Sequence, residues 1–141
     1  MQVWLRQLEG LAMAGTADSH HWVVMDTDKD VGGSNGASKP LELVLMGLGG
    51  CTGMDVLSIL KKMRVNLERF EMVLDAERAE EHPRVFTGIR VEYRVFGENI
   101  DPEHVERAIA LSRTKYCAVS AMLSKSVPIE FSYRINPKST E

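Results

Sequence analysis

Two cysteines are the side chains of this sequence best suited to chemistry. Cys51 lies among small residues in Gly49-Gly-Cys-Thr-Gly53, and Cys117 lies in Lys115-Tyr-Cys-Ala-Val-Ser120. A thiolate is a nucleophile that peroxides oxidise to a sulfenic acid, and a second thiol can condense with it to a disulfide. The two cysteines can therefore form a peroxidatic and resolving pair, but each can also be an inert apolar side chain of the core. Only the fold can bring them together.

The residues around the two cysteines set conditions on such chemistry. On a helix, Leu48, Met54 and Asp55 share the face of Cys51, so Leu48 and Met54 are expected to line a substrate pocket. Asp55 by itself would raise the pKa of the thiol, so a reactive thiolate needs a cation from elsewhere in the fold. Arg113 places positive charge near Cys117.

The remaining motifs give no metal or cofactor site. Asp26-Thr-Asp-Lys-Asp30 resembles the start of a calcium loop, but Val31 and Ala37 stand where that loop needs glycine and glutamate. An acidic turn exposed to solvent is the better interpretation. The four histidines and two cysteines lack the spacing of zinc ligands. No metal and no cofactor is expected.

The stretch from Leu41 to Met63 predicts a long central helix. Up to Leu60 only Glu42 and Asp55 carry charge. A helix that is apolar nearly all round is buried on most sides, and the two acids and four glycines argue against a membrane span. Ser38 is the expected N-cap. One chain of this size does not easily cover such a helix, so a twofold dimer is one solution.

The rest of the chain predicts short strands and two further helices. Alternation of apolar and polar residues is strongest in 67–78 and 86–96, with acids on the outer face of one strand and arginines on that of the other. The predicted strands are 2–8, 11–14, 21–25, 67–78, 86–96 and 128–135, and the predicted helices are 41–63, 102–113 and 116–125. The order is βββ–α–ββ–αα–β, which indicates an α+β fold with antiparallel sheets. A single domain over residues 1–141 is expected.

The composition and the first residues of the chain limit the classes of binding partner and the cellular compartment that are expected. The net charge of −3 and the lack of a basic run argue against nucleic acid. The first residues lack the basic and apolar regions of a secretory signal, so a cytoplasmic protein with reduced thiols is expected.

Together the two cysteine contexts resemble the OsmC/Ohr family of osmotically inducible and organic hydroperoxide resistance proteins. The resemblance rests on Pro40-Leu-Glu-Leu43, Gly49-Gly-Cys-Thr-Gly-Met-Asp-Val56 and Lys115-Tyr-Cys-Ala-Val-Ser120, and it extends over the predicted element order. It is closest to an OsmC-like branch in which two glycines precede the first cysteine.

The resemblance implies an intertwined homodimer with active sites at the dimer interface. It implies that Cys51 is the peroxidatic and Cys117 the resolving cysteine, that organic hydroperoxides are favoured over hydrogen peroxide, and that an external dithiol, in one branch a lipoyl group, restores the thiols. A small-ligand-binding dimer and a slow redox sensor are the alternatives.

The sequence departs from the family pattern at two places. Well-studied members carry an arginine in the N-terminal strands that stabilises the thiolate, whereas residues 17–22 here contain histidines and no arginine. His21 is either a substitute partner of the thiolate or a histidine packed in a strand. The family's glutamate directly follows the proline, whereas here Glu42 comes one place later, on the opposite face of an ideal helix from Cys51.

Overall fold

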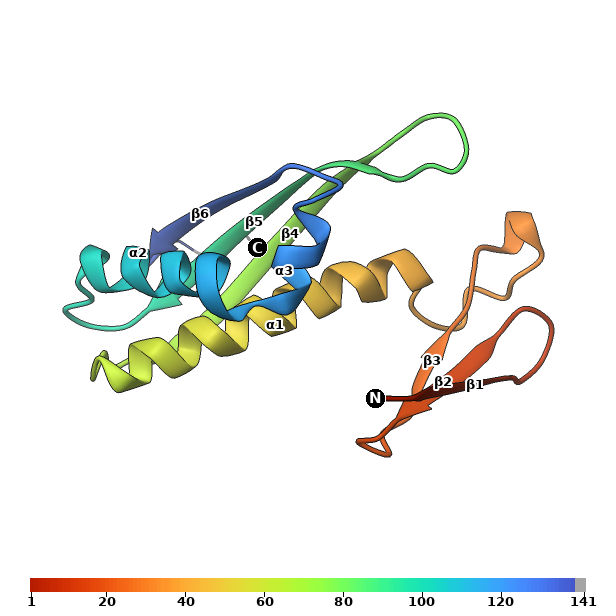
Figure 1. Ribbon diagram of the computed structural model, residues 1–141, viewed down its shortest axis with the longest axis horizontal. Coiled ribbons are helices and arrows are strands. Elements are labelled where there is room, and N and C mark those ends of the chain that lie inside the picture. Colours follow the sequence, from red (N-terminus) through yellow and green to blue (C-terminus); the bar gives the residue numbers. More distant parts are fainter. Residues whose placement is uncertain (139–141) are drawn as a thin grey trace. The chain divides into compact units, whose positions relative to one another are not determined.

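The structure, a computed structural model, describes residues 1–138. Figure 1 shows its helices and strands in chain order. They are β1 (Val3–Gln7), β2 (Met13–Ala17), β3 (Val23–Met25), η1 (Lys29–Val31), α1 (Pro40–Lys62), β4 (Arg69–Arg78), β5 (Phe86–Phe96), α2 (Pro102–Leu111), η2 (Ser112–Tyr116), α3 (Ala118–Leu123) and β6 (Ile129–Ile135). The α+β class and the order βββ–α–ββ–αα–β are confirmed. The chain divides into two compact units, residues 1–46 and residues 47 onward, which are described separately.

The first unit holds an antiparallel sheet in the order β1-β2-β3. The second strand was expected over 11–14 with a turn over 15–19, but it runs Met13–Ala17. The reason is the turn at Gly10, where the Leu8 N–H donates to the Ala12 carbonyl, so pairing resumes only at Met13. Gly15 then lies opposite Leu5, whose side chain fills the space beside it.

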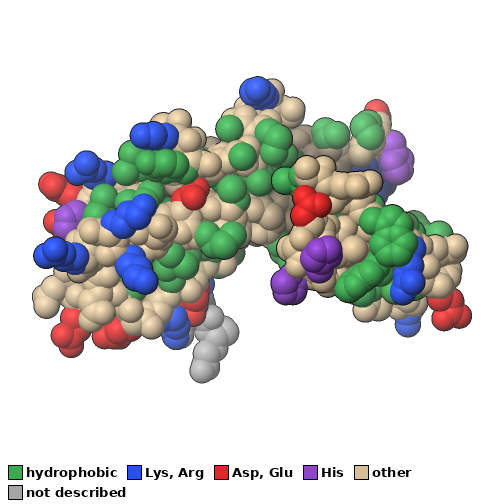
Figure 2. Space-filling view, turned by 60° about the horizontal axis from the view of Figure 1, so that its bottom comes forward, with side chains coloured by type: hydrophobic (Ala, Val, Ile, Leu, Met, Phe, Trp, Pro, Cys, Tyr) green, Lys and Arg blue, Asp and Glu red, His purple; other side chains and the backbone are tan. Residues whose placement is uncertain are grey.

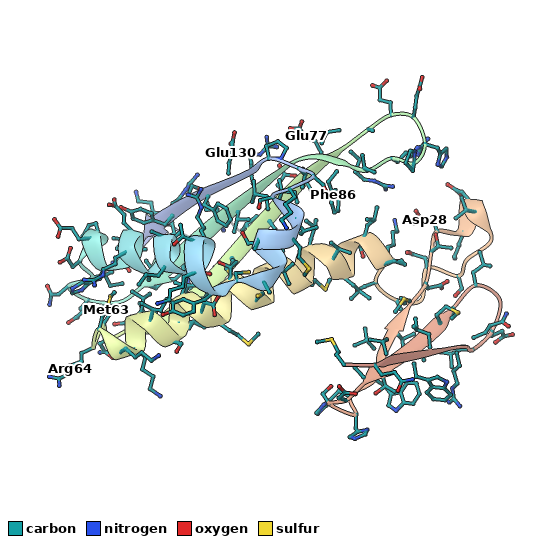
Figure 3. All side chains as sticks on the ribbon, in the orientation of Figure 1. Asp28, Met63, Arg64, Glu77, Phe86 and Glu130 are labelled. Atoms are coloured by element: carbon teal, nitrogen blue, oxygen red, sulfur yellow. The ribbon has the colours of Figure 1, made fainter. Side chains whose placement is uncertain are left out.

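Asp26 organises the loop between β3 and α1. Its carboxylate is 3% exposed and accepts hydrogen bonds from Thr27, Ser34 and Gly36. These bonds, first among them that of the Ser34 hydroxyl, hold the pKa of Asp26 well below its usual range. The expectation of an acidic turn exposed to solvent is therefore wrong for Asp26, which is buried and bonded to its own loop. Asp28, labelled in Figure 3, forms an ion pair with Lys39 at 2.7 Å.

Helix α1 begins at Pro40, and the expected N-cap at Ser38 is wrong by one residue. Lys39 is the residue before the helix: its carbonyl accepts from the Leu43 N–H, and its own N–H donates to Glu42 Oε2 at 2.9 Å. Ser38 instead continues the pairing of β3, since its carbonyl accepts from the Asp26 N–H. The helix ends before Met63 and Arg64, both labelled in Figure 3, with Arg64 in the left-handed conformation.

In the second unit α1 is buried on one side only. Leu48, Thr52, Val56 and Leu60 have no exposed surface, whereas Met54 is 67% exposed. The prediction of a helix buried on most sides is thus wrong for the single chain. Figure 2 shows hydrophobic side chains, drawn in green, at the surface of the protein. Although α1 is long and apolar enough to cross a membrane, one of its faces packs in the core of the second unit.

Two glycines bring α1 close to β4. A Cβ at Gly53 would lie 2.7 Å from Met72 Sδ, and a Cβ at Gly49 would lie 3.0 Å from Leu74 Cδ1. Glycine lowers the stability of a helix, but at these two positions a larger residue would clash with the side chains of β4 and force the helix away from the sheet. Cys51 lies between them in the sequence, so the close approach fixes the distance of this part of the α1 backbone from β4.

The second sheet has the order β4-β5-β6, and one of its two pairings differs from the expectation. Strands β4 and β5 are antiparallel, but β5 and β6 are parallel. Parallel neighbours need a long crossover, and residues 97–128 supply it through α2, η2 and α3. The expected cross-strand charge pairs are confirmed: Arg90 of β5 forms ion pairs with Asp75 and Glu77 of β4. Glu77 is labelled in Figure 3.

The crossover carries the second cysteine. Asp101 caps α2 by accepting from the Glu103 N–H, as its sequence predicts. The helix was expected to reach Arg113, but after Leu111 it widens into the π-helical turn η2. Cys117 follows this turn and is the N-cap of α3.

Candidate active site

The structure brings the two cysteines together on the second unit. The sulfur atoms of Cys51 and Cys117 and a carboxylate oxygen of Asp55 lie within 4.8 Å of one another. Both cysteines are free thiols. Cys51 is half-buried and Cys117 is 2% exposed, so one sulfur can be reached from solvent and the other lies behind it.

Local structure explains this meeting. Cys51 and Asp55 are one turn apart on α1 and therefore share a face. The five-residue turn η2 sets the place of Cys117, whose N–H donates to the Ser112 carbonyl at 2.9 Å. Its sulfur accepts a hydrogen bond from the Ser120 N–H at 3.3 Å. Backbone bonds thus hold Cys117 from both sides.

The surroundings of Cys117 favour its protonated form. Burial first, then a hydrogen bond with Cys51 and the negative charges of Cys51 and Asp55, raise the pKa of Cys117 to about 11, against the opposing effect of the Ser120 N–H. At neutral pH this residue is therefore a thiol that can donate a proton in a hydrogen bond to its neighbour.

A buried chain of hydroxyl groups ends on Asp55. Thr52 Oγ1 lies 2.5 Å from the Tyr93 hydroxyl and 2.8 Å from Ser112 Oγ, and Ser112 donates to Asp55 Oδ2 at 3.0 Å. Thr52, Tyr93 and Ser112 have no exposed surface. The chain ties α1, β5 and the turn η2 to one another at the level of the cysteines.

The direction of this chain follows from proton counting. Ser112 has one hydroxyl proton, which it gives to the carboxylate, so its oxygen accepts from Thr52. Thr52 has then used its own proton and accepts from Tyr93. Burial raises the pKa of Tyr93 to about 12, which keeps that phenol protonated as the first donor. All three hydroxyls are therefore polarised toward Asp55.

Three other expected site residues in this unit are placed as follows. Arg113 is exposed, with its guanidinium carbon 4.7 Å from the centre of the Phe131 ring. Leu48 has no exposed surface and belongs to the core, whereas Met54 lies open on the other side of α1.

His21 and Glu42 belong to the first unit. His21 is exposed and lines a largely apolar cavity of about 390 Å³, together with Val3, Leu5, Gly15, Thr16, Ala17, Ser19, Val23, Met25 and Leu43. Glu42 bonds the start of its own helix through the Lys39 N–H.

Sequence reasoning missed the hydroxyl chain. Thr52, Tyr93 and Ser112 come from three elements far apart in the sequence, and hydroxyl residues at such positions have no distinctive spacing. Thr52 directly follows Cys51, and Ser112 lies five residues before Cys117, but hydroxyl residues at such positions also occur in ordinary protein cores.

The protein is expected to lose stability between about pH 8.5 and pH 11, on the order of 1 kcal/mol per pH unit from Cys117. The folded pKa of about 11 lies above that of an unfolded thiol, so the unfolded state binds fewer protons in this window and stability falls as pH rises. Urea unfolding at several pH values measures the slope. Cys117→Ser, which cannot titrate, should have a shallower slope, and equal slopes would contradict the assignment.

Comparisons with known proteins agree with this structure. Residues 32–132 match the family model described as OsmC-like protein. Protein YhfA of Escherichia coli (strain K12) is 42% identical over 137 residues, which cover 96% of this chain and 98% of that protein. The crystal structure of a hypothetical protein from Aquifex aeolicus VF5 superposes with a TM-score of 0.83 at 28% identity, covering 98% of this chain and 97% of that one. An organic hydroperoxide resistance protein OsmC from Legionella pneumophila has a TM-score of 0.69 at 16% identity, covering 94% and 96%, and shares the fold.

Proposed function

Because this chain belongs to the OsmC-like protein family, we propose that it is a thiol peroxidase that reduces organic hydroperoxides. The observation that carries the proposal is the approach of the Cys51 and Cys117 sulfurs to within 4.8 Å. A disulfide needs an S–S distance of about 2.05 Å. Rotation about the Cα–Cβ bonds of two neighbouring cysteines moves their sulfur atoms toward each other.

Burial divides the roles between the two thiols. Cys51 is half-buried and can meet a substrate, whereas Cys117 is enclosed and held as a thiol by its raised pKa. The accessible sulfur is therefore the peroxidatic one, and the S–H of Cys117 stabilises its thiolate by a hydrogen bond. Cys117 is the resolving cysteine.

The reaction consists of two balanced steps and a reduction. The Cys51 thiolate attacks one oxygen of the O–O bond, which gives a sulfenic acid and an alkoxide that takes up a proton to become the alcohol. The Cys117 sulfur then attacks the sulfenic sulfur, forming the disulfide, and its proton leaves with the hydroxyl group as water. An external dithiol, of which a lipoyl group is one type, reduces the disulfide by exchange and is itself oxidised.

We further propose that the active form is a twofold homodimer of a single OsmC-like domain. The match over 32–132 runs across the boundary between the two compact units, which supports one domain. The exposed apolar side chains of α1 and of the first sheet are surfaces that a second copy of the chain would cover. These surfaces include Met54 and Leu57 of α1 and Val3, Trp4 and Leu5 of β1. A reducing, cytoplasmic compartment suits two free thiols.

Met54→Lys is expected to weaken the dimer by roughly a hundredfold or more, because a charge on the buried centre of an interface must be desolvated. Sedimentation of the variant over a range of concentrations measures the change. Lys61→Met, at an exposed position near the end of the same helix, is the control for helix content. A wild-type protein that sediments as a monomer at high concentration would contradict the dimer.

The peroxidase proposal is tested by adding cumene hydroperoxide to the reduced protein and counting thiols. Loss of both thiols at one equivalent of peroxide, with one disulfide found by mass spectrometry, is expected. Thiols that remain after excess peroxide would refute the function. Turnover with dihydrolipoamide then distinguishes a peroxidase, which cycles, from a redox sensor, which forms the disulfide once and is slow to be reduced.

One observation supports a second candidate function, the binding of a small hydrophobic molecule. The cavity of about 390 Å³ in the first unit has the size and the largely apolar lining of small-molecule sites. Native mass spectrometry of freshly purified protein tests this candidate. A bound molecule together with peroxide-inert thiols would replace the peroxidase proposal by the binding one.

A further inference from the structure

Asp55 is the one acidic group of the described thiol site, and its position has a chemical consequence. Its carboxylate oxygen lies within 4.8 Å of both sulfurs. A carboxylate at this distance opposes the ionisation of a thiol, so it acts against the reactivity of a cysteine unless protonation is what the site needs. Cys117, the buried thiol, is the one that the proposed reaction requires to stay protonated at first.

The carboxylate is held in place by the interior of the protein. Ser112 donates to Oδ2, and Ser112 is itself fixed through Thr52 to the buried Tyr93 hydroxyl. A surface carboxylate would rotate into solvent, whereas this one is bonded at the end of three polarised hydroxyls. The arrangement gives Asp55 a defined direction toward the sulfurs.

The other charged and titratable groups around Cys117 do not take over this role. Cys51 faces it from α1, and Tyr93 from β5 stays neutral at physiological pH. Arg113 on η2 stacks over Phe131. Lys62 lines a cavity of about 240 Å³ beside Asp55, with Ser58, Ile59, Leu111 and Tyr116.

We propose that Asp55 is a positioning residue that adds its charge to the effect of burial in holding Cys117 a protonated thiol until Cys51 has been oxidised, with the Ser112–Thr52–Tyr93 hydroxyl chain fixing its carboxylate. The catalytic meaning of this inference rests on the proposed function. While Cys51 is a thiolate, two negative charges face Cys117. Conversion of Cys51 to a neutral sulfenic acid removes one of them, which lowers the pKa of Cys117 at the moment when its sulfur must attack.

The test is a titration of Cys117 alone. In a Cys51→Ser background Cys117 is the one remaining cysteine, and its 13Cβ chemical shift reports the ionisation of its thiol without any peroxide. Asp55→Asn keeps an oxygen that accepts from Ser112 but removes the charge, so it should lower the pKa of Cys117 by roughly half a unit or more. Asp55→Glu keeps the charge and should shift it less. Ser112→Ala, which frees the carboxylate, should shift the pKa in the same direction as Asp55→Asn.

Glu98→Gln is the matched control, because it removes an exposed acid that follows β5. Superimposable titration curves for Asp55→Asn and Glu98→Gln would overturn the inference. If Asp55→Asn does not fold, a Ser112→Ala curve that matches the Glu98→Gln control would do the same. Peroxide consumption by the wild type is measured separately, so a protein that consumes none but shows the shift refutes the proposed function and leaves the electrostatic role of Asp55 standing.

Discussion

Cys51→Ser is expected to lower the rate of cumene hydroperoxide reduction at least about a thousandfold, because it removes the nucleophile of the first step. A serine hydroxyl is a much weaker nucleophile than a thiolate, and the neighbouring carboxylate of Asp55 has its Oδ2 bonded to Ser112. The rate is measured with dihydrolipoamide as reductant, by assaying the remaining peroxide colorimetrically over time.

Cys117→Ser gives the matched comparison. This variant should still consume one equivalent of peroxide per site, but it should stop at a Cys51 sulfenic acid that dimedone traps, since the resolving thiol is gone. Both variants are checked by circular dichroism. A Cys51→Ser protein that keeps turning over, or a Cys117→Ser protein that is not oxidised at all, would show that the roles were assigned to the wrong sulfurs.

Thr52→Val is expected to destabilise the protein by roughly 2–4 kcal/mol, the second large effect. Valine has the shape of threonine but cannot bond, so it leaves the buried Tyr93 hydroxyl without its acceptor and Ser112 without its donor. A buried polar group that loses its partner bears a desolvation cost of about 1–3 kcal/mol. Urea denaturation at neutral pH measures the difference.

Thr52→Ser separates the hydroxyl from the methyl group. Serine keeps both hydrogen bonds and loses one buried methyl, which costs only about 1 kcal/mol. If the valine and serine variants were equally stable, the hydroxyl chain would not contribute to stability, and the position of Asp55 would have to depend on something else.

The sequence predicted the fold well because its signals were local. Alternation in 67–78 and 86–96, the Asp101-Pro102 start and the apolar run from Leu41 each depend on neighbours in the chain, and the structure has an element at each place. The resemblance of the cysteine contexts anticipated that Cys51 and Cys117 would meet, although their separation in sequence could not show it.

The features that sequence reasoning missed depend on distant contacts. The parallel pairing of β5 and β6 is set by how the crossover returns, and the one-sided burial of α1 is set by which of its residues reach β4. Ser38 was preferred as a cap by residue type, but its carbonyl is engaged by Asp26 from another part of the loop. The hydroxyl chain unites three elements and could be found only in three dimensions.

The turn η2 limits how this segment of the chain can change in length. Ser112 contributes both the hydroxyl that bonds Asp55 and the carbonyl that accepts from Cys117, and five residues of π-helical geometry set the interval between them. Deleting or inserting one residue between 112 and 117 would rotate the sulfur away from α1 while the hydroxyl stayed in place. We therefore expect an insertion or deletion in this short stretch to separate the two thiols, whereas one in the exposed turn at 80–84 between β4 and β5 should disturb neither.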